Sequence, residues 1–464
     1  MSRHSFVKTI LAVGACRLVR FLMRVLHRGG TTLPGRVAML FDKDILEVVS
    51  EGVKTILVTG TNGKTTTSHM ISHVLSEVGI RHIYNHSGAN LISGITTEFC
   101  CAALPDGKPR YGYAVIECDE GALEQVASMI HPDVILVTNL FRDQLDRYGE
   151  VMNTLSAIQR GIRKATEATL CLNADCSLTS YLALSAQNPV IYYGLGSATG
   201  SSVQPEISDA RYCIRCGRAY RYNYHTYAHL GGFYCPQCGY RRKSPQVLAE
   251  SIIAADREST CFAIRTEDEE TEVRLMLPAL YNVYNACAAA CGYIAFADRI
   301  KTEKNTVPYL KQFTKSLAGI QPSFGRMERI DIENRCIRII LVKNPVGCNQ
   351  VISYLNQLDE AYELVICLND RTADGHDISW IWDADYESFA GDSDLARIYV
   401  MGDRAEDMML RLKYADLDCS MIVHVSGYRE LLSELQKGSL PVFAMPNYTA
   451  MGSFRENMKR FSGC

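Results

Sequence analysis

The sequence predicts an α/β protein built from two doubly wound domains. Apolar runs alternate with amphipathic helical patterns from residue 54 onward, and a second alternation follows residue 328. The runs are continuously apolar, which is typical of parallel strands covered on both faces by helices. A Gly-containing loop follows the first run, and two C-x-x-C pairs interrupt the first alternation. We therefore expect a central P-loop ATPase domain with an inserted zinc ribbon and a smaller Rossmann-like C-terminal domain.

The chain of 464 residues is long enough for two or three domains with separate cores. We expect an N-terminal basic and apolar helical segment over residues 1–53. The central domain is expected over residues 54–316, with the ribbon inserted at 205–245. The C-terminal domain is expected over residues 317–464, after a linker-like stretch, "SLAGIQPSFGRME" (316–328).

Composition limits the function classes. The net charge of −3 gives no support to a nucleic-acid binder that works through overall basicity. The 18 cysteines are scattered through apolar segments and no cleavable secretory signal is evident, so free thiols in a reducing, cytoplasmic compartment are expected.

The N-terminal segment "FVKTILAVGACRLVRFLMRVLHRGG" is apolar, but Lys8, Arg17, Arg20 and Arg24 interrupt it. No uninterrupted run reaches the roughly 18–20 apolar residues of a spanning helix. Two interpretations remain. The segment is a basic amphipathic helix lying on an anionic membrane surface, or a helix packed against the first domain with its charges in water.

A phosphate-binding loop is expected in "VTGTNGKTTT", between an apolar strand and an amphipathic helix. Glycines permit the tight turn, and backbone N–H groups at the start of the helix face the phosphates. Lys64 would reach the β- and γ-phosphates and the Thr65 hydroxyl would bind Mg²⁺. The full Walker pattern asks for glycine where this chain has Val58. The candidate ATP-binding residues here are Gly60, Thr61, Asn62, Gly63, Lys64, Thr65 and Thr66.

This loop resembles that of the Mur ligase superfamily, whose members join a carboxylate to an amine through an acyl phosphate. Further similar motifs follow in the same order: "VIECDE", "VTNLFRDQLDRYG", "LYNVYNACAA" and "FGRME". The resemblance implies that Glu117 binds Mg²⁺ together with Thr65, and that Asn282, Asn285 and Arg326 contact the nucleotide. The alternative, purely structural roles are that Glu117 ends a strand and caps a loop, that Asn282 caps a helix and that Arg326 is a surface charge in the linker.

The chain also departs from the Mur pattern. Gln144 replaces a metal-binding histidine, and Lys343 in "LVKNP" stands at the family's basic position. The loop begins about 55 residues into the chain, so we expect no large N-terminal domain for a UDP-sugar and do not expect the substrate to be held by a UDP end.

A metal site is expected in "CIRCGRAYRYNYHTYAHLGGFYCPQCG". Two C-x₂-C pairs separated by eighteen residues, Cys213, Cys216, Cys235 and Cys238, can close a tetrahedral Zn²⁺ shell. A redox dithiol would need one such pair. Four arginines interleaved with tyrosines form either a solvated basic face or a nucleic-acid-binding surface. They are Arg211, Arg215, Arg218 and Arg221.

Four further segments accompany the ribbon and the expected absence of a UDP-sugar domain: "NHSGANLISGITT", "LVKNPVGCNQ", "DGHDISWIWD" and "MPNYTAM". In these features the chain resembles the MurT family, the ligase subunits of lipid II isoglutaminyl synthases. The resemblance implies that ATP activates the α-carboxylate of D-glutamate in the lipid II stem peptide. Ammonia would then give D-isoglutamine, supplied by a GatD-type glutamine amidotransferase in a heterodimer. No nucleophile elbow that would make this chain its own glutaminase is evident in the sequence.

The segment "RTADGHDISWIWDADYE" holds both tryptophans, Trp380 and Trp382, which favours a protein interface. The resemblance implies that Asp377 completes the partner's Cys–His pair, with Asp374 and Asp383 as fallbacks. Alternatively, Asp377 caps a helix.

Two alternative functions fit the sequence: a folylpolyglutamate-synthase-like ligase, and a P-loop ATPase whose ribbon binds nucleic acid. His86, Asn90 and Thr96 are candidates for substrate or nucleotide contact. A lipid substrate would place the protein at the inner face of the cell membrane as a peripheral protein.

Overall fold

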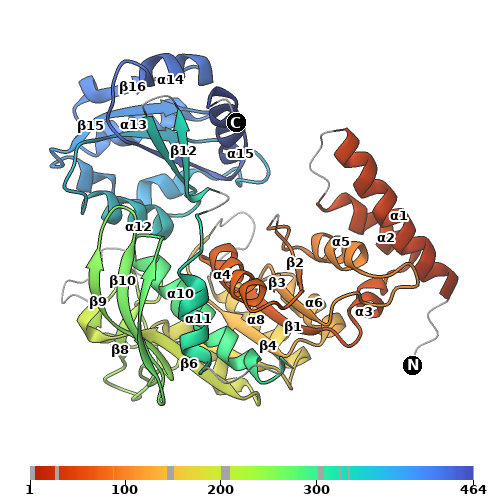
Figure 1. Ribbon diagram of the computed structural model, residues 1–464. Coiled ribbons are helices and arrows are strands. Elements are labelled where there is room, and N and C mark those ends of the chain that lie inside the picture. Colours follow the sequence, from red (N-terminus) through yellow and green to blue (C-terminus); the bar gives the residue numbers. More distant parts are fainter. Residues whose placement is uncertain are drawn as a thin grey trace.

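The computed structural model describes residues 6–26, 31–86, 88–143, 151–199, 209–300, 308–322, 325–332 and 335–462. Two α/β domains follow one another along the chain. A helical N-terminal segment lies beside the first, at one edge of it (Figure 1).

The central domain is built on a nine-stranded sheet in the order β11-β10-β9-β6-β5-β4-β1-β3-β2. Its strands are β1 (Lys54–Thr59), β2 (Ile83–Tyr84), β3 (Tyr113–Glu117), β4 (Val134–Val137), β5 (Thr169–Asn173), β6 (Val190–Leu195), β9 (Val247–Ala255), β10 (Thr260–Arg265) and β11 (Glu270–Leu275). The strands from β2 to β9 pair in parallel, as the sequence predicts. In contrast, β9, β10 and β11 form an antiparallel edge that the sequence does not predict.

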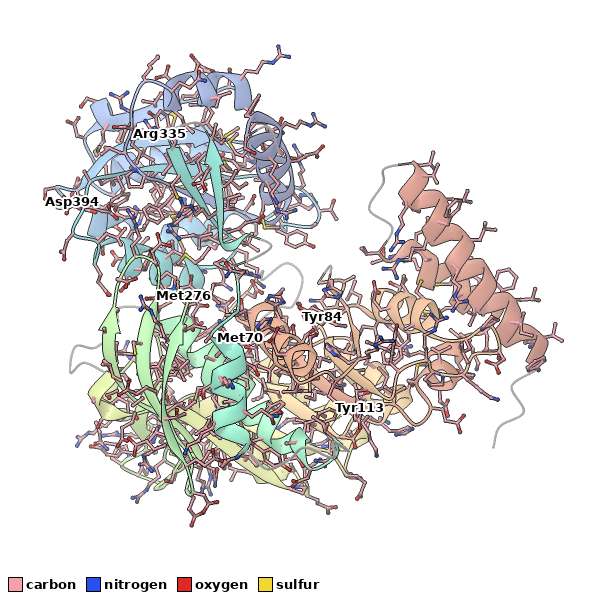
Figure 2. All side chains as sticks on the ribbon, viewed as in Figure 1. Met70, Tyr84, Tyr113, Met276, Arg335 and Asp394 are labelled. Atoms are coloured by element: carbon pink, nitrogen blue, oxygen red, sulfur yellow. The ribbon has the colours of Figure 1, made fainter. Side chains whose placement is uncertain are left out.

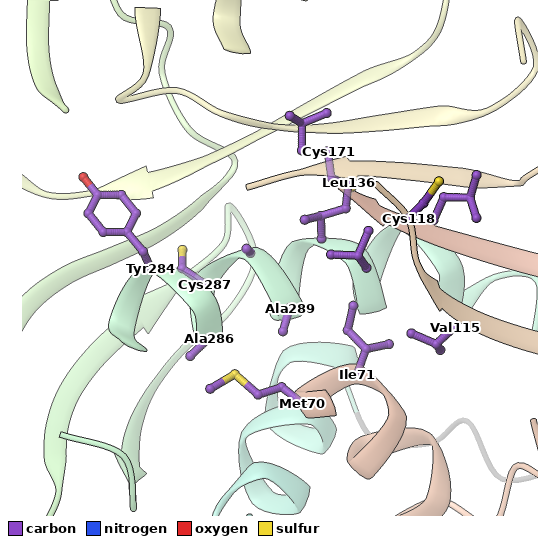
Figure 3. Packing of buried hydrophobic residues seen from close by; sticks show 14 of the residues in the cluster. Met70, Ile71, Val115, Cys118, Leu136, Cys171, Tyr284, Ala286, Cys287 and Ala289 are labelled. Carbon is purple, nitrogen blue, oxygen red and sulfur yellow. The ribbon is translucent and has the colours of Figure 1, made fainter. Parts of the chain in front are cut away.

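Helices cover the central sheet on both faces. They are α4 (Lys64–Glu77), α5 (Ile92–Ala102), α6 (Leu123–Ile130), α8 (Val151–Lys164), α9 (Ser177–Leu182), α10 (Leu280–Ala297) and α11 (Tyr309–Leu317), with short 3₁₀ turns η1 (Ala183–Ser185) and η2 (Ser197–Thr199). Helix α10 is buried along most of its length and is rich in Ala and Cys, so it packs closely against α4 and the strands (Figure 3). A Cβ added at Gly292 would lie 2.8 Å from Leu136, which shows how near α10 lies to β4.

The N-terminal segment forms α1 (Phe6–Val25), α2 (Leu33–Phe41) and α3 (Ile45–Ser50). Helix α1 packs against α2 and against α5 of the central domain. Among the described residues, no helix is both long and apolar enough to cross a bilayer.

The inserted segment forms a two-stranded antiparallel sheet, β7 (Arg221–His225) and β8 (Gly231–Tyr234). Tyr220, Phe233 and Tyr240 form a small aromatic core beside its cysteines.

The C-terminal domain has a six-stranded sheet in the order β12-β13-β17-β14-β15-β16. Its elements are β12 (Arg326–Ile332), β13 (Arg335–Ile340), α12 (Pro345–Leu355), β14 (Tyr362–Cys367), η3 (Ser379–Asp383), η4 (Tyr386–Phe389), β15 (Leu395–Met401), α13 (Ala405–Tyr414), η5 (Cys419–Met421), β16 (Ile422–His424), α14 (Tyr428–Leu435), β17 (Val442–Pro446) and α15 (Tyr448–Phe461). All neighbours pair in parallel except β12 with β13. Arg335, labelled in Figure 2, forms a buried ion pair with Glu363 inside this domain.

The stretch expected to be a linker, 316–328, is partly ordered secondary structure. It contains the end of α11 and the start of β12. Strand β12 alternates buried and exposed side chains over much of its length, because it is an edge strand with one face in solvent.

Candidate active site

The phosphate loop lies at the carboxyl end of β1, where the chain has strands on both sides. After β1 the chain first builds β2 and β3 on one side and then β4, β5 and β6 on the other. The carboxyl ends of β1, β3 and β4 therefore meet at a topological switch point, the usual ligand site of such sheets.

Two glycines shape the loop. Gly60 has φ 117° and Gly63 has φ 86°, both in the left-handed region that favours glycine. A Cβ on Gly60 would lie 2.4 Å from the Thr138 hydroxyl oxygen, and one on Gly63 would lie 2.1 Å from the Asn285 side-chain oxygen. Close packing at both positions therefore excludes larger residues and places Asn285 directly beside the loop.

The segment that follows β4, residues 138–141, holds the loop. The Asn62 N–H donates to the Asn139 side-chain oxygen at 2.9 Å, and the Asn139 amide donates to the Asn62 carbonyl at 3.0 Å. The Thr61 hydroxyl donates to the Phe141 carbonyl at 3.1 Å and accepts from its N–H at 3.0 Å. These bonds fix the loop backbone before any nucleotide binds.

Lys64 is buried at the first position of α4. Its ammonium donates to Glu120 at 2.9 Å and to the loop carbonyl of Gly60. Burial acts to lower the pKa of Lys64, but the carboxylates of Glu120, Glu117 and Asp119 outweigh it and raise the pKa above its usual value. Lys64 is thus charged at neutral pH and ready to bind phosphate.

Glu117 ends β3 and faces the start of α4. Its carboxylate accepts from the Thr65 hydroxyl at 2.8 Å and from the Asn90 amide at 3.1 Å. Asn85 fixes the Glu117 backbone through two hydrogen bonds of 2.9 Å. The cluster offers oxygen atoms of a carboxylate, a hydroxyl and an amide, which are the ligand types that Mg²⁺ prefers.

A pocket opens between α4 and the segment that leads to the C-terminal domain. Arg326 lines it together with Thr65 and Thr66, and Tyr84, labelled in Figure 2, lies on its wall. Its lining residues are Thr65, Thr66, His69, Tyr84, Leu277, Gln321, Pro322 and Arg326. Burial lowers the pKa of the Arg326 guanidinium below its usual value, and the nearby Glu117 carboxylate acts to raise that pKa. The pocket adjoins the loop, and Arg326 brings a cation to its wall.

The start of α12 in the C-terminal domain reaches the loop directly. Asn344 caps α12 by accepting from the Gly347 N–H at 2.8 Å. Its amide also pairs with that of Asn62 in both directions, at 3.0 and 3.3 Å. The domain interface therefore includes the phosphate loop itself.

Lys343, the residue before Asn344, forms an ion pair with Asp143 of the central domain. Burial acts to raise the pKa of Asp143, but the Lys343 ammonium outweighs it and holds the pKa below its usual range. Asp143 therefore stays ionised at neutral pH and attracts the C-terminal domain toward the loop. Gln144 lies outside the described residues.

Replacing Asn344 with Ala is expected to loosen the domain interface, because it removes both amide contacts to Asn62 and the cap of α12. We expect a larger radius of gyration in solution scattering and a KM for ATP raised by about tenfold, equivalent to about 1.4 kcal/mol. Asn349→Ala is the matched control, since its side chain binds the Asp385 N–H within the C-terminal domain. Equal compactness of the Asn344→Ala variant and the unmodified protein would contradict this role for the amide pair.

The four ribbon cysteines converge. Their sulfur atoms all lie within 4.8 Å of one another, with Cys213 and Cys238 at 3.6 Å and Cys216 and Cys235 at 3.5 Å. Bonds of about 2.3 Å to one tetrahedral Zn²⁺ would separate sulfurs by about 3.8 Å, so the cluster fits that ion. Glycines with positive φ follow each pair, at Gly217 (73°) and Gly239 (72°).

The ribbon also contacts the segment after β4 that holds the loop. His229, at the tip between β7 and β8, packs edge-on against Phe141 with ring centroids 4.9 Å apart. The neighbouring Tyr227 ring lies 6.0 Å from the same ring. Because Phe141 binds Thr61, the ribbon tip supports the phosphate loop from behind.

The acidic segment before η3 lies in the C-terminal domain and contacts Arg142 of the central domain through Asp383. Asp377 is exposed, and its carboxylate accepts from the Ser379 N–H at 2.8 Å. The side chain and the N–H of Ser379 together hold the pKa of Asp377 below its usual value. Asp374 is buried and binds Thr449, and Asp383 pairs with Arg142. Asp377 and Asp383 are both exposed, but Asp383 is held in an ion pair with Arg142 whereas Asp377 binds only its neighbour Ser379.

The structure brings together all the candidate ATP-binding residues, from Gly60 to Arg326. Asn282 joins them through Asn285, whose amide donates to it at 3.2 Å. Asn90 lies at Glu117, whereas Thr96 is buried in α5 and binds the Ile92 carbonyl, and His86 stacks edge-on against Tyr84. Glu120 and Asn139 were not predicted as site residues from the sequence. Each lies within three residues of the end of an apolar strand at the switch point, and this position could have identified them.

A P-loop at the switch point of a Mur-like central sheet, with a second α/β domain contacting it, defines an ATP-dependent ligase of the Mur class. The family description "Mur ligase middle domain" matches residues 58–215, and "MurT ligase C-terminal" matches residues 341–451. The chain belongs to the MurT family.

The relatives span nearly the whole chain. The lipid II isoglutaminyl synthase (glutamine-hydrolyzing) subunit MurT of Streptococcus pneumoniae is 34% identical over 97% of this chain and 97% of its own length. The subunit of the same name from Staphylococcus aureus (strain COL) is 34% identical over the same shares.

Solved structures share the fold. MurF from Acinetobacter baumannii gives a TM-score of 0.65 at 16% identity, covering 92% of this chain and 81% of that one. A pseudomurein peptide ligase type C from Methanothermus fervidus gives 0.64 at 19% identity, covering 88% and 79%. The whole-chain relatives favour the MurT interpretation over both rival functions.

Proposed function

We propose that this chain is the ligase subunit of a lipid II isoglutaminyl synthase. An oxygen of the D-glutamate α-carboxylate attacks the γ-phosphorus of ATP, giving an acyl phosphate and ADP. Ammonia then attacks the acyl carbon, phosphate leaves with the bonding electron pair, and loss of a proton gives the D-isoglutamine amide. The observation that supports this most is the loop of Lys64 within a chain whose relatives at 97% coverage bear that name.

The roles of the loop residues follow from their positions. Lys64 would leave Glu120 and neutralise the β- and γ-phosphates, while the N–H groups at the start of α4 bind the same oxygens. Asn282, Asn285 and Arg326 would contact the rest of the nucleotide. Thr65 and Glu117 would hold Mg²⁺, which neutralises phosphate charge when it is bound.

The ammonia is proposed to come from a GatD-type glutamine amidotransferase in a heterodimer with this chain. Asp377 would orient the partner's catalytic histidine as the third member of a triad. The exposure of Asp377 in the C-terminal domain supports this role. Trp382, five residues later in the sequence, is also exposed and suits a protein interface. A lipid II substrate would place the enzyme on the cytoplasmic side, peripheral to the membrane.

The ribbon is proposed to bind a structural Zn²⁺ through Cys213, Cys216, Cys235 and Cys238. All four ligand positions would be filled by thiolates, so the ion would stabilise the fold and take no part in the reaction.

Cys213→Ser combined with Cys216→Ser is expected to remove about one zinc ion per chain, measured by metal analysis. The melting temperature should fall, because metal binding at such a site contributes to folding. ATP affinity should also fall, because His229 at the ribbon tip packs against Phe141, which binds the phosphate loop. Cys261→Ser and Cys419→Ser lie outside the cluster and serve as controls. Unchanged zinc content in the double variant would rule out this site.

The proposed reaction is tested with purified chain, lipid II, ATP, Mg²⁺ and ammonium chloride. Formation of ADP together with amidated lipid II is the expected result. Amidation from glutamine should require the partner subunit in addition. Amidation of a folate substrate but not of lipid II would support the folylpolyglutamate-type rival instead.

A further inference from the structure

Helix α1 presents an apolar surface to solvent. Six of its side chains, each between 39% and 61% exposed, fall within an arc of about 120° on the helix at 100° per residue. They are Ile10, Leu11, Leu18, Phe21, Leu22 and Val25, here named the α1 stripe. Soluble surfaces rarely expose such a contiguous apolar patch without a function.

The opposite face of α1 fixes this orientation. Small side chains of Thr9, Ala12, Val13 and Cys16 are buried against the neighbouring helices. Arg20 forms two hydrogen bonds of 3.1 Å with the Glu98 carboxylate of α5. The helix is thus anchored through its small and polar residues while its large apolar residues face outward, the reverse of an ordinary surface helix.

The surroundings of the stripe are basic. Helix α1 contains no acidic residue, and the exposed Lys8 and Arg24 flank the stripe on either side. Residues 1–43 contain eight lysines and arginines and one aspartate, a formal charge of +7. The whole chain is at −3, so residues 44–464 are at −10, and the positive charge is concentrated in the N-terminal part of the sequence that contains α1.

The surface continues onto α2. Leu40, at 85%, is among the most exposed large apolar side chains in the described part of the chain, and Leu33 and Phe41 of the same helix are also exposed. Figure 1 shows α1 and α2 side by side at the edge of the molecule, with no helix or strand on their outer side in this view. Nothing in the described residues covers this edge.

We infer that the α1 stripe docks on an anionic bilayer, with α1 lying in the plane of the interface. The apolar side chains would enter the acyl boundary while the flanking cations bind acidic headgroups. A second copy of this chain is a poorer occupant, because stripe-to-stripe pairing would bring like charges together. The inference rests on the proposed function in one respect: a lipid-anchored substrate makes such docking useful.

The docking test uses the full-length chain with its amidotransferase partner and vesicle flotation. The vesicles contain either phosphatidylglycerol with phosphatidylethanolamine or phosphatidylcholine alone. The unmodified complex should float with the anionic vesicles, and less so at high salt. Leu18→Ser combined with Phe21→Ser should lower the bound fraction at least about tenfold, since both lose apolar burial in the bilayer.

Two further variants sharpen the test. Leu184→Ser with Ile253→Ser removes two side chains that are each 50% exposed elsewhere, and it should float like the unmodified complex. Lys8→Gln with Arg24→Gln should weaken binding to anionic vesicles and leave binding to phosphatidylcholine unchanged. The stripe variant should still amidate a detergent-solubilised, short-chain lipid II analogue at the unmodified rate, while amidation in vesicles falls.

The outcomes separate the two proposals. If the unmodified complex does not float, or the stripe variant floats equally well, the docking inference is overturned even if amidation proceeds. Flotation without amidation of either substrate would instead overturn the proposed function and leave docking standing. If light scattering shows that the unmodified chain dimerises and the stripe variant does not, a second copy occupies the surface and the inference is wrong.

Discussion

Lys64→Met is expected to lower the rate of ADP formation about 10²- to 10³-fold, the usual loss when one positioned charge is removed from a transition state. Lys64 follows the tight turn at Gly63 and is the first residue of α4, so its ammonium lies where the phosphates would bind. Steady-state assays with lipid II and ammonium chloride measure the effect. Because the reaction is mostly positioning and charge neutralisation, kcat should fall more than KM rises.

A stability control is needed, because Lys64 and Glu120 are a buried ion pair. Removing the lysine alone leaves an uncompensated buried carboxylate, which destabilises the fold. The double variant Lys64→Met with Glu120→Gln should regain much of the lost melting temperature but none of the activity. If the double variant recovered both, the effect of Lys64 would be structural and its phosphate-binding role would be contradicted.

Asp377→Asn is expected to reduce glutamine-driven amidation by about 10⁴-fold, the scale found when the carboxylate of such a triad becomes an amide. Amidation driven by added ammonium chloride should remain at the unmodified rate, because the hydrogen-bond partner of Asp377 is Ser379 and not a residue of the phosphate loop. The exchange preserves shape, and the asparagine oxygen can still accept the Ser379 N–H.

Asp383→Asn is the matched control. It lies in the same segment and is exposed, but its carboxylate pairs with Arg142 of the central domain. Glutaminase activity of the assembled pair should survive this change. Loss of glutaminase in Asp383→Asn with retention in Asp377→Asn would transfer the role to Asp383.

The sequence predicted the two α/β domains because their central strands are buried on both faces and so are continuously apolar. Strand β4, "VILV", is fully buried, and the short loop after β1 needed glycines that are recognisable by spacing. The antiparallel edge was missed, because β9 alternates apolar and polar residues only in part and its ladder with β10 shifts register twice.

Site residues were predictable where a motif surrounds them and not where only tertiary contact defines them. Glu117 and Asn285 stand in ordered motifs, and the structure places both at the loop. Asn344 reaches Asn62 across 282 positions of sequence, and no local pattern marks such a pair. The outward orientation of α1 was likewise open, because its helical pattern fits both burial and membrane contact.

The most direct test of the central claim measures ADP and amidated lipid II in one reaction, with ammonium chloride as nitrogen donor. The expected result is that the two products form in equal amounts, and that both disappear in Lys64→Met. ATP recovered intact alongside unmodified lipid II, or ADP released without any amide, would contradict a ligase that activates a carboxylate by phosphorylation.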